Sequence, residues 1–117
     1  MTHEQLKLLS QMKKLIKNGK CRFQVRNDRD YLEELLNLGI SEREAWNYIL
    51  TLNSNFYVHD FKPNYLINGE SLIFKRLING NIAYIKLKIE KSESDEETVC
   101  LSFHKDSSNK GEYVNEM

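Results

Sequence analysis

A regular alternation of apolar and polar side chains between positions 71 and 105 constrains the fold more than any other feature of this sequence. Strand side chains point to opposite faces at every second residue, so the run 82–89 has one apolar face and one polar face. Asn79-Gly80 precedes that run, and this dipeptide signals a two-residue hairpin because both turn residues need positive φ. The pattern therefore predicts three antiparallel strands, at 72–78, 82–89 and 99–103.

Two constraints fix how these strands pair. The two-residue loop sets the register of the first two strands. Burial sets that of the third, because a slip of one residue would move every apolar side chain of a strand to the opposite face. The pairs that satisfy both constraints are Ile78 with Asn81, Phe74 with Ile85, Lys75 with Tyr84, Ile89 with Val99, Lys86 with Ser102, and Tyr84 with His104.

This register places a row of three chemically reactive side chains across the predicted sheet. Lys75, Tyr84 and His104 lie on neighbouring strands and share the polar face. Lys86 and Lys88 follow on the same side of the central strand. The row is therefore the candidate functional site.

The first half of the chain predicts three helices. Two of them begin with the S/T-x-x-E/Q spacing of a capping box, which satisfies the unpaired amides of a helix start. Apolar residues then recur at helical spacing, and glycine follows the first two segments as a left-handed stop. The predicted helices run from Thr2 to Asn18-Gly19, from about Asp28 to Leu38, and from Ser41 to Leu52, with a short extended segment at 21–25.

The order of these elements predicts an α+β fold. The N-terminal helices would pack on one face of an antiparallel sheet of four or five strands, leaving the other face open and basic. Residues 1–105 form a single domain in this interpretation. Residues 106–117 are polar, lack apolar periodicity and are predicted to be a disordered tail.

Composition limits the possible partners and compartments. The 117 residues carry 17 basic and 17 acidic side chains, which argues against a strongly basic nucleic-acid binder. Residues 62–88 nevertheless contain five basic residues and one acidic residue, and such a surface can bind an anion. No apolar run approaches the roughly 20 residues of a membrane span and no leader is recognisable, so we expect a cytoplasmic protein. Cys21 and Cys100 lack metal-ligand spacing and are expected to be reduced, structural thiols; no metal or cofactor is expected.

Several short motifs, taken in their order along the chain, resemble the motility quorum-sensing regulator (MqsR) family. They are LSQMKKL at 9–15, Phe56-Tyr57, YIK at 84–86, and Ser102-Phe103. The resemblance extends from Leu6 to Lys105. Members of that family are bacterial type II toxins with a RelE-like fold, which cleave mRNA and are neutralised by an antitoxin protein. The resemblance therefore implies a RelE-like endoribonuclease acting on mRNA, free or on the ribosome, with a cognate antitoxin as partner. It implies neither membrane attachment nor DNA binding by the chain alone.

The resemblance also implies roles for individual residues. The family's catalytic tyrosine, in a Tyr-hydrophobic-Lys segment, corresponds to Tyr84. The family lysine after Phe-Tyr corresponds to Val58, and the lysine after Ser-Phe corresponds to His104. The family glutamine before the first hairpin strand has no counterpart near Ser71. Related RelE- and YoeB-type toxins place a histidine at the end of the last strand, where this chain has His104.

Metal-free RNA cleavage needs groups that the row contains. The 2′-hydroxyl attacks the adjacent phosphate, which requires a base, an acid for the leaving 5′-oxygen, and cations around the phosphorane. Histidine can act as base or acid near neutral pH, and a tyrosine hydroxyl can hold or protonate an oxygen. We therefore predict Tyr84, His104 and Lys75 as catalytic residues. The predicted RNA contacts are Lys86, Lys88, Lys105, Lys62 and His59.

Each of these residues also has an ordinary structural explanation. Lysines on an exposed sheet face oppose aggregation, a strand-end histidine can be a surface residue, and Tyr84 can be a cross-strand packing partner. Two hypotheses therefore stand: a toxin-like endoribonuclease, and a non-catalytic RelE-like fold that binds a protein or RNA partner. Val58 and the neutral charge favour the second, whereas His104 opposite Tyr84 favours the first.

Overall fold

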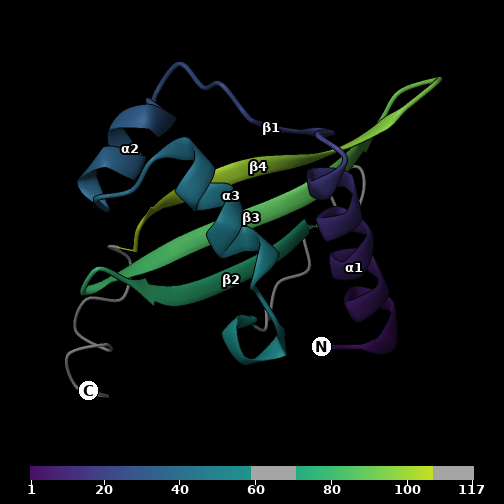
Figure 1. Ribbon diagram of the computed structural model, residues 1–117, viewed down its shortest axis with the longest axis horizontal. Coiled ribbons are helices and arrows are strands. Elements are labelled where there is room, and N and C mark those ends of the chain that lie inside the picture. The colour runs from purple at the N-terminus through teal and green to yellow at the C-terminus, as the bar shows by residue number, and fades with distance from the viewer. Residues whose placement is uncertain (59–70, 107–117) are drawn as a thin grey trace.

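Three α-helices cover one face of a four-stranded sheet in the part of the chain that the computed structural model describes, residues 1–58 and 71–106 (Figure 1). The predicted α+β class is therefore confirmed. His59 and Lys62, two predicted RNA contacts, lie outside the described residues. No helix within this part is long and apolar enough to cross a membrane. In chain order the elements are α1 (His3–Lys17), β1 (Cys21–Phe23), α2 (Tyr31–Asn37), α3 (Glu42–Leu50), the 3-10 helix η1 (Ser54–Phe56), β2 (Ser71–Ile78), β3 (Asn81–Lys91) and β4 (Glu96–Lys105).

The sheet is mixed, so the prediction of a wholly antiparallel sheet is wrong. The strand order is β1-β4-β3-β2, and β1 runs parallel to β4 while the other pairs are antiparallel. Cys21 pairs with Thr98, from which it is separated in the chain by α2, α3 and the β2–β3 hairpin. A tight turn dictates an antiparallel neighbour, whereas no residue near Cys21 sets the direction of so distant a partner.

The hairpin between β2 and β3 has the predicted register. Asn79 and Gly80 adopt φ values of 50° and 83°, as a two-residue turn of this kind requires. Lys75 opposes Tyr84, and Phe74 opposes Ile85. The local turn therefore fixes both the pairing and the face on which each side chain lies.

A β-bulge changes the register of the third strand halfway along. Lys86 opposes Ser102, as predicted, but the next residue of β3, Leu87, opposes Cys100, so Leu101 is the extra residue. The predicted pair of Ile89 with Val99 is therefore wrong, since Ile89 opposes Thr98. The extra residue reverses which residues of β4 face the helices on its N-terminal side. The regular alternation in the sequence does not reveal the bulge.

The bulge turns two unexpected side chains toward the helices. Cys100, which the regular alternation placed on the polar face, is buried in the core cluster. Thr98 is also fully buried, and its Oγ1 donates a hydrogen bond to the carbonyl oxygen of Met12 in α1 at 3.0 Å. The first half of β4 thereby attaches α1 to the sheet.

One hydrophobic cluster joins the helices to the sheet in the described residues. It is built from the inward faces of α1, α2 and α3 and from alternate residues of the strands, which gives the two layers seen in Figure 1. Its members from the helices and their ends include Leu9, Met12, Ile16, Leu35, Leu38, Ala45, Ile49 and Leu52. Its members from the strands are Phe23, Leu72, Phe74, Ile78, Ala83, Ile85, Leu87, Cys100 and Phe103.

The helix starts follow the predicted capping chemistry, with one shift. Both capping boxes form, at Thr2 with Gln5 and at Ser41 with Glu44. The second helix begins later than predicted, because Asp30 rather than Asp28 accepts the N-terminal hydrogen bond, from the backbone amide of Leu32 at 3.0 Å. Both aspartates are competent caps, so the sequence alone leaves the choice between them open.

Two cations from other elements bind the C-terminal end of α3, whose own last turn has no basic residue. Arg76 of β2 donates to the carbonyl oxygen of Tyr48 at 3.0 Å and to Thr51 Oγ1 at 2.8 Å. Its guanidinium lies over the rings of Tyr48 and Phe56, at 5.0 and 4.5 Å from their centroids. Lys13 of α1 donates to the carbonyl oxygen of Leu52. These contacts compensate the negative helix end and join α3 to both neighbouring elements.

Candidate functional site

The predicted row of Lys75, Tyr84 and His104 forms across β2, β3 and β4. The sequence neighbours of these residues, Phe74, Ile85 and Phe103, are buried in the core under the helices. Because side chains alternate along a strand, the row lies on the sheet face opposite the helices. All three side chains are half-buried.

Tyr84 and His104 form a stacked aromatic pair within this row. Their ring centroids are 5.3 Å apart and the ring planes differ by 19°. Such a pair stabilises a sheet by about 0.5–1.5 kcal/mol beyond its buried area, and it limits the rotation of both rings. The stack therefore brings a phenol and an imidazole together in a fixed relation.

A backbone contact determines which nitrogen of neutral His104 carries the proton. Its Nδ1 lies 2.8 Å from the carbonyl oxygen of Lys105. A carbonyl oxygen can only accept, so Nδ1 is the donor. In the neutral ring Nε2 is then the unprotonated nitrogen, which is the state required of a general base.

Lys75 pairs with a carboxylate that the sequence analysis assigned to the tail. Its Nζ lies 3.0 Å from Oδ2 of Asp106, and the two side chains are only 14% and 2% exposed. The amide of Asp106 donates to the carbonyl oxygen of Ile82 at 2.8 Å, so β-type pairing continues one residue past Lys105. Asp106 therefore extends the pairing of β4 by one residue, whereas residues 107–117 lie outside the described part. Asp106 lacks apolar neighbours in the sequence, which is why the pattern placed it in a tail.

The remaining predicted RNA contacts divide between the two sides of the sheet. Lys86 and Lys88 lie on the same face as the row, opposite Ser102 and Val99 respectively. Lys105 opposes the core residue Ala83, so it starts from the other face although its side chain is exposed. The structure therefore brings Lys86 and Lys88 beside the row but does not bring Lys105 there.

The face that carries the row is less open and less basic than predicted. Its lysines are half-buried, and Val99 is fully buried. Arg22 of β1 forms ion pairs with Glu90 and Glu97, each at 2.6 Å. Together with Asp106 these acids compensate part of the positive charge. Among residues 1–58 and 71–106, the lysines on the face of the row that form no ion pair with an acidic residue of this part are Lys86 and Lys88, both on β3.

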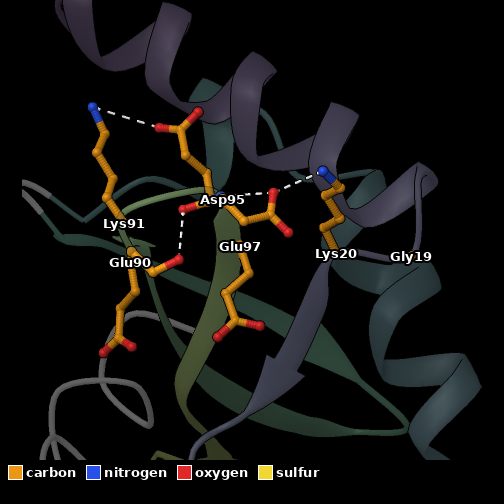
Figure 2. A pocket seen from close by; sticks show the side chains of 8 residues that line it. Gly19, Lys20, Glu90, Lys91, Asp95 and Glu97 are labelled. Atoms are coloured by element: carbon orange, nitrogen blue, oxygen red, sulfur yellow. Dashed lines mark hydrogen bonds and ion pairs between the residues drawn. The ribbon is translucent and has the colours of Figure 1, made fainter.

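A polar pocket of about 390 Å³ lies at the other end of the β3–β4 hairpin, away from the row (Figure 2). Figure 2 shows Asp95 directed toward Lys20, and the two form an ion pair at 2.7 Å. Lys91 pairs with Glu96 at 3.5 Å. These charges neutralise one another, and the described residues contain no cluster that could hold a metal ion. The pocket is therefore explained by solvated, mutually compensating charges at the turn of the hairpin.

Both cysteines are free thiols, as predicted. Burial raises the pKa of the Cys100 thiol well above its ordinary value. The thiol also donates a hydrogen bond to the carbonyl oxygen of Ser102, at 3.3 Å. Burial, with Glu97 and Glu42 nearby, also raises the pKa of Cys21. Neither thiol is suited to be a nucleophile, because the thiolate is the reactive form.

The raised pKa of Cys100 predicts a loss of stability at alkaline pH. In the unfolded chain the thiol ionises from about pH 9, whereas in the folded chain it stays protonated. The unfolded state then binds fewer protons, so the free energy of unfolding falls with rising pH, by up to about 1.4 kcal/mol per pH unit. Urea unfolding of the wild type and Cys100→Ala between about pH 8 and pH 10, under reducing conditions, measures the contribution of Cys100 to the pH dependence of the unfolding free energy. Equal pH slopes for the two proteins would contradict it.

Comparison with known proteins adds no assignment: the sequence matches no protein-family model, and neither a curated protein nor a solved structure matches it significantly.

Proposed function

We propose that this chain is a metal-independent mRNA endoribonuclease of the RelE-like toxin class, active in the cytoplasm and inhibited by a cognate antitoxin protein. The observation that carries the proposal is the stacked Tyr84–His104 pair on the sheet face opposite the helices. Lys86 lies two residues along β3 on the same face. The resemblance to the MqsR family in motif order supports the same class.

The geometry suggests a role for each residue of the proposed site. His104 Nε2 takes the proton of the 2′-hydroxyl, which then attacks the neighbouring phosphorus. The Tyr84 hydroxyl holds a phosphate oxygen or gives its proton to the leaving 5′-oxygen. The Lys86 ammonium stabilises the charge that develops on the phosphorane. Lys75 is less suited to that last role, because its charge is already compensated by Asp106.

Incubation of the full chain with a defined single-stranded RNA in EDTA tests this proposal. Attack by the 2′-hydroxyl breaks the bond from phosphorus to the 5′-oxygen, so the products carry a 2′,3′-cyclic phosphate and a 5′-hydroxyl. We expect both ends, mapped by primer extension and mass spectrometry, without added metal. Cleavage that requires a divalent cation would contradict the mechanism.

The ion pair of Lys75 with Asp106 favours a second candidate, a RelE-like fold that binds RNA or a protein without cutting. Neutralisation of one cation of the row, and Val58 in place of the family lysine, both reduce the charge available for catalysis. The same incubation separates the two candidates. Retention of intact RNA in a gel-shift assay, with no new ends, would favour the binder.

A further inference from the structure

Among the described residues, Asp106 is the acidic residue that forms an ion pair with a member of the row, and its carboxylate is buried. Its side chain is 2% exposed. A carboxylate at such a position costs several kcal/mol in lost hydration unless a cation compensates it. Lys75, itself 14% exposed, supplies that cation at 3.0 Å.

The pair spans the central strand of the sheet. Lys75 lies on β2, Asp106 follows β4, and β3 runs between them. The amide of Asp106 is bound to the carbonyl oxygen of Ile82, while Lys75 stands opposite Tyr84. The lysine side chain therefore crosses β3 at the level of Ile82 and Tyr84, on the face that carries the row.

We propose that Asp106 is a positioning residue, which holds the Lys75 ammonium beside the Tyr84 phenol; its effect on catalysis rests on the proposed nuclease function. An ammonium held next to a phenol can donate a hydrogen bond to its oxygen, which stabilises the phenolate left after proton transfer even when the net charge of the ion pair is zero. A lysine side chain without a fixed partner samples many rotamers and extends toward water. Asp106 removes that freedom, and it acts on the reaction only through Lys75.

The position of Lys75 can be measured without reference to activity. An ammonium held in a buried ion pair exchanges its protons slowly and gives an observable ¹H–¹⁵N signal, which Lys75→Met would assign. We expect the signal in the full-length wild type and its loss in Asp106→Asn. The matched control is Asp95→Asn, which removes the partner of Lys20 from an exposed ion pair and leaves the Lys75 signal unchanged. Persistence of the Lys75 signal in Asp106→Asn would overturn the inference.

The consequence for catalysis is measured by steady-state RNA cleavage. We expect Asp106→Asn to lower kcat about tenfold with KM unchanged, since Lys75 acts on proton transfer and not on RNA binding. A purely structural carboxylate would change stability but leave kcat of the folded protein at the wild-type value. A raised KM with unchanged kcat would also overturn the positioning role.

A double variant covers the case in which Asp106→Asn does not fold. Lys75→Met with Asp106→Asn removes the buried pair as a unit, which proteins tolerate better than the loss of one partner. A folded double variant with kcat lowered about tenfold supports the inference, and wild-type kcat overturns it. If the wild type cleaves no RNA, the proposed function fails, while the Lys75 signal still decides whether Asp106 holds the lysine.

Discussion

Replacing His104 with alanine is expected to slow RNA cleavage by about 10²–10⁴-fold and to abolish growth arrest on induction. The substitution removes the only histidine that the structure places in the row within the described residues, and with it the proposed base Nε2. Tyr84→Phe is the complementary change, because it keeps the stacked ring and deletes only the hydroxyl. We expect a similar loss of growth arrest.

The matched control for this experiment is His3→Ala. His3 is exposed at the start of α1, in the helical layer, so its removal should leave cleavage and growth arrest at the wild-type level. Circular dichroism and thermal melting establish that each variant is folded. Growth arrest that survives both His104→Ala and Tyr84→Phe would leave non-catalytic binding as the better account.

Replacing Phe74 with alanine is expected to cost about 3–5 kcal/mol of unfolding free energy. Phe74 is fully buried in the middle of β2, opposite Ile85, and its ring packs against Tyr57 at 5.8 Å between centroids. Truncation leaves a cavity between the sheet and the helices. Since domains of this size have only about 5–15 kcal/mol of stability, a large fraction would be lost.

Urea unfolding followed by the fluorescence of Trp46 measures this effect, because that ring packs against Phe23 and the hydrophobic cluster to which Phe74 belongs. Leu77→Ala is the control on the same strand. Leu77 is 60% exposed, so its truncation should change the unfolding free energy by less than about 0.5 kcal/mol. Equal effects of the two substitutions would contradict the burial pattern of β2.

The features that sequence reasoning predicted correctly are those set by neighbouring residues. Asn79-Gly80 determined the hairpin, and the hairpin determined that Lys75 opposes Tyr84. The two capping boxes likewise depend on residues three positions apart. Local signals of this kind can be recognised in a single sequence, because each depends on the backbone requirements of residues within one turn.

The features that sequence reasoning missed depend on residues that are distant in the chain. The parallel pairing of β1 with β4 joins Cys21 to Thr98, and the ion pair joins Lys75 to Asp106. Neither pairing is marked in the sequence by a turn motif or by a characteristic residue spacing. The wrong placement of Lys105 beside the row has a different cause, since a local signal argued against it. Lys105 directly follows His104 in the strand, so the two side chains start from opposite faces.

The extra residue at Leu101 divides β4 into two segments of opposite phase. The segment that opposes the first half of β3 presents His104 to the row, and the segment that opposes its second half presents Thr98 to α1. In an unbroken strand these two side chains, six positions apart, would lie on one face. The inserted residue thus permits a single strand to serve the candidate site on one surface and the attachment of α1 on the other.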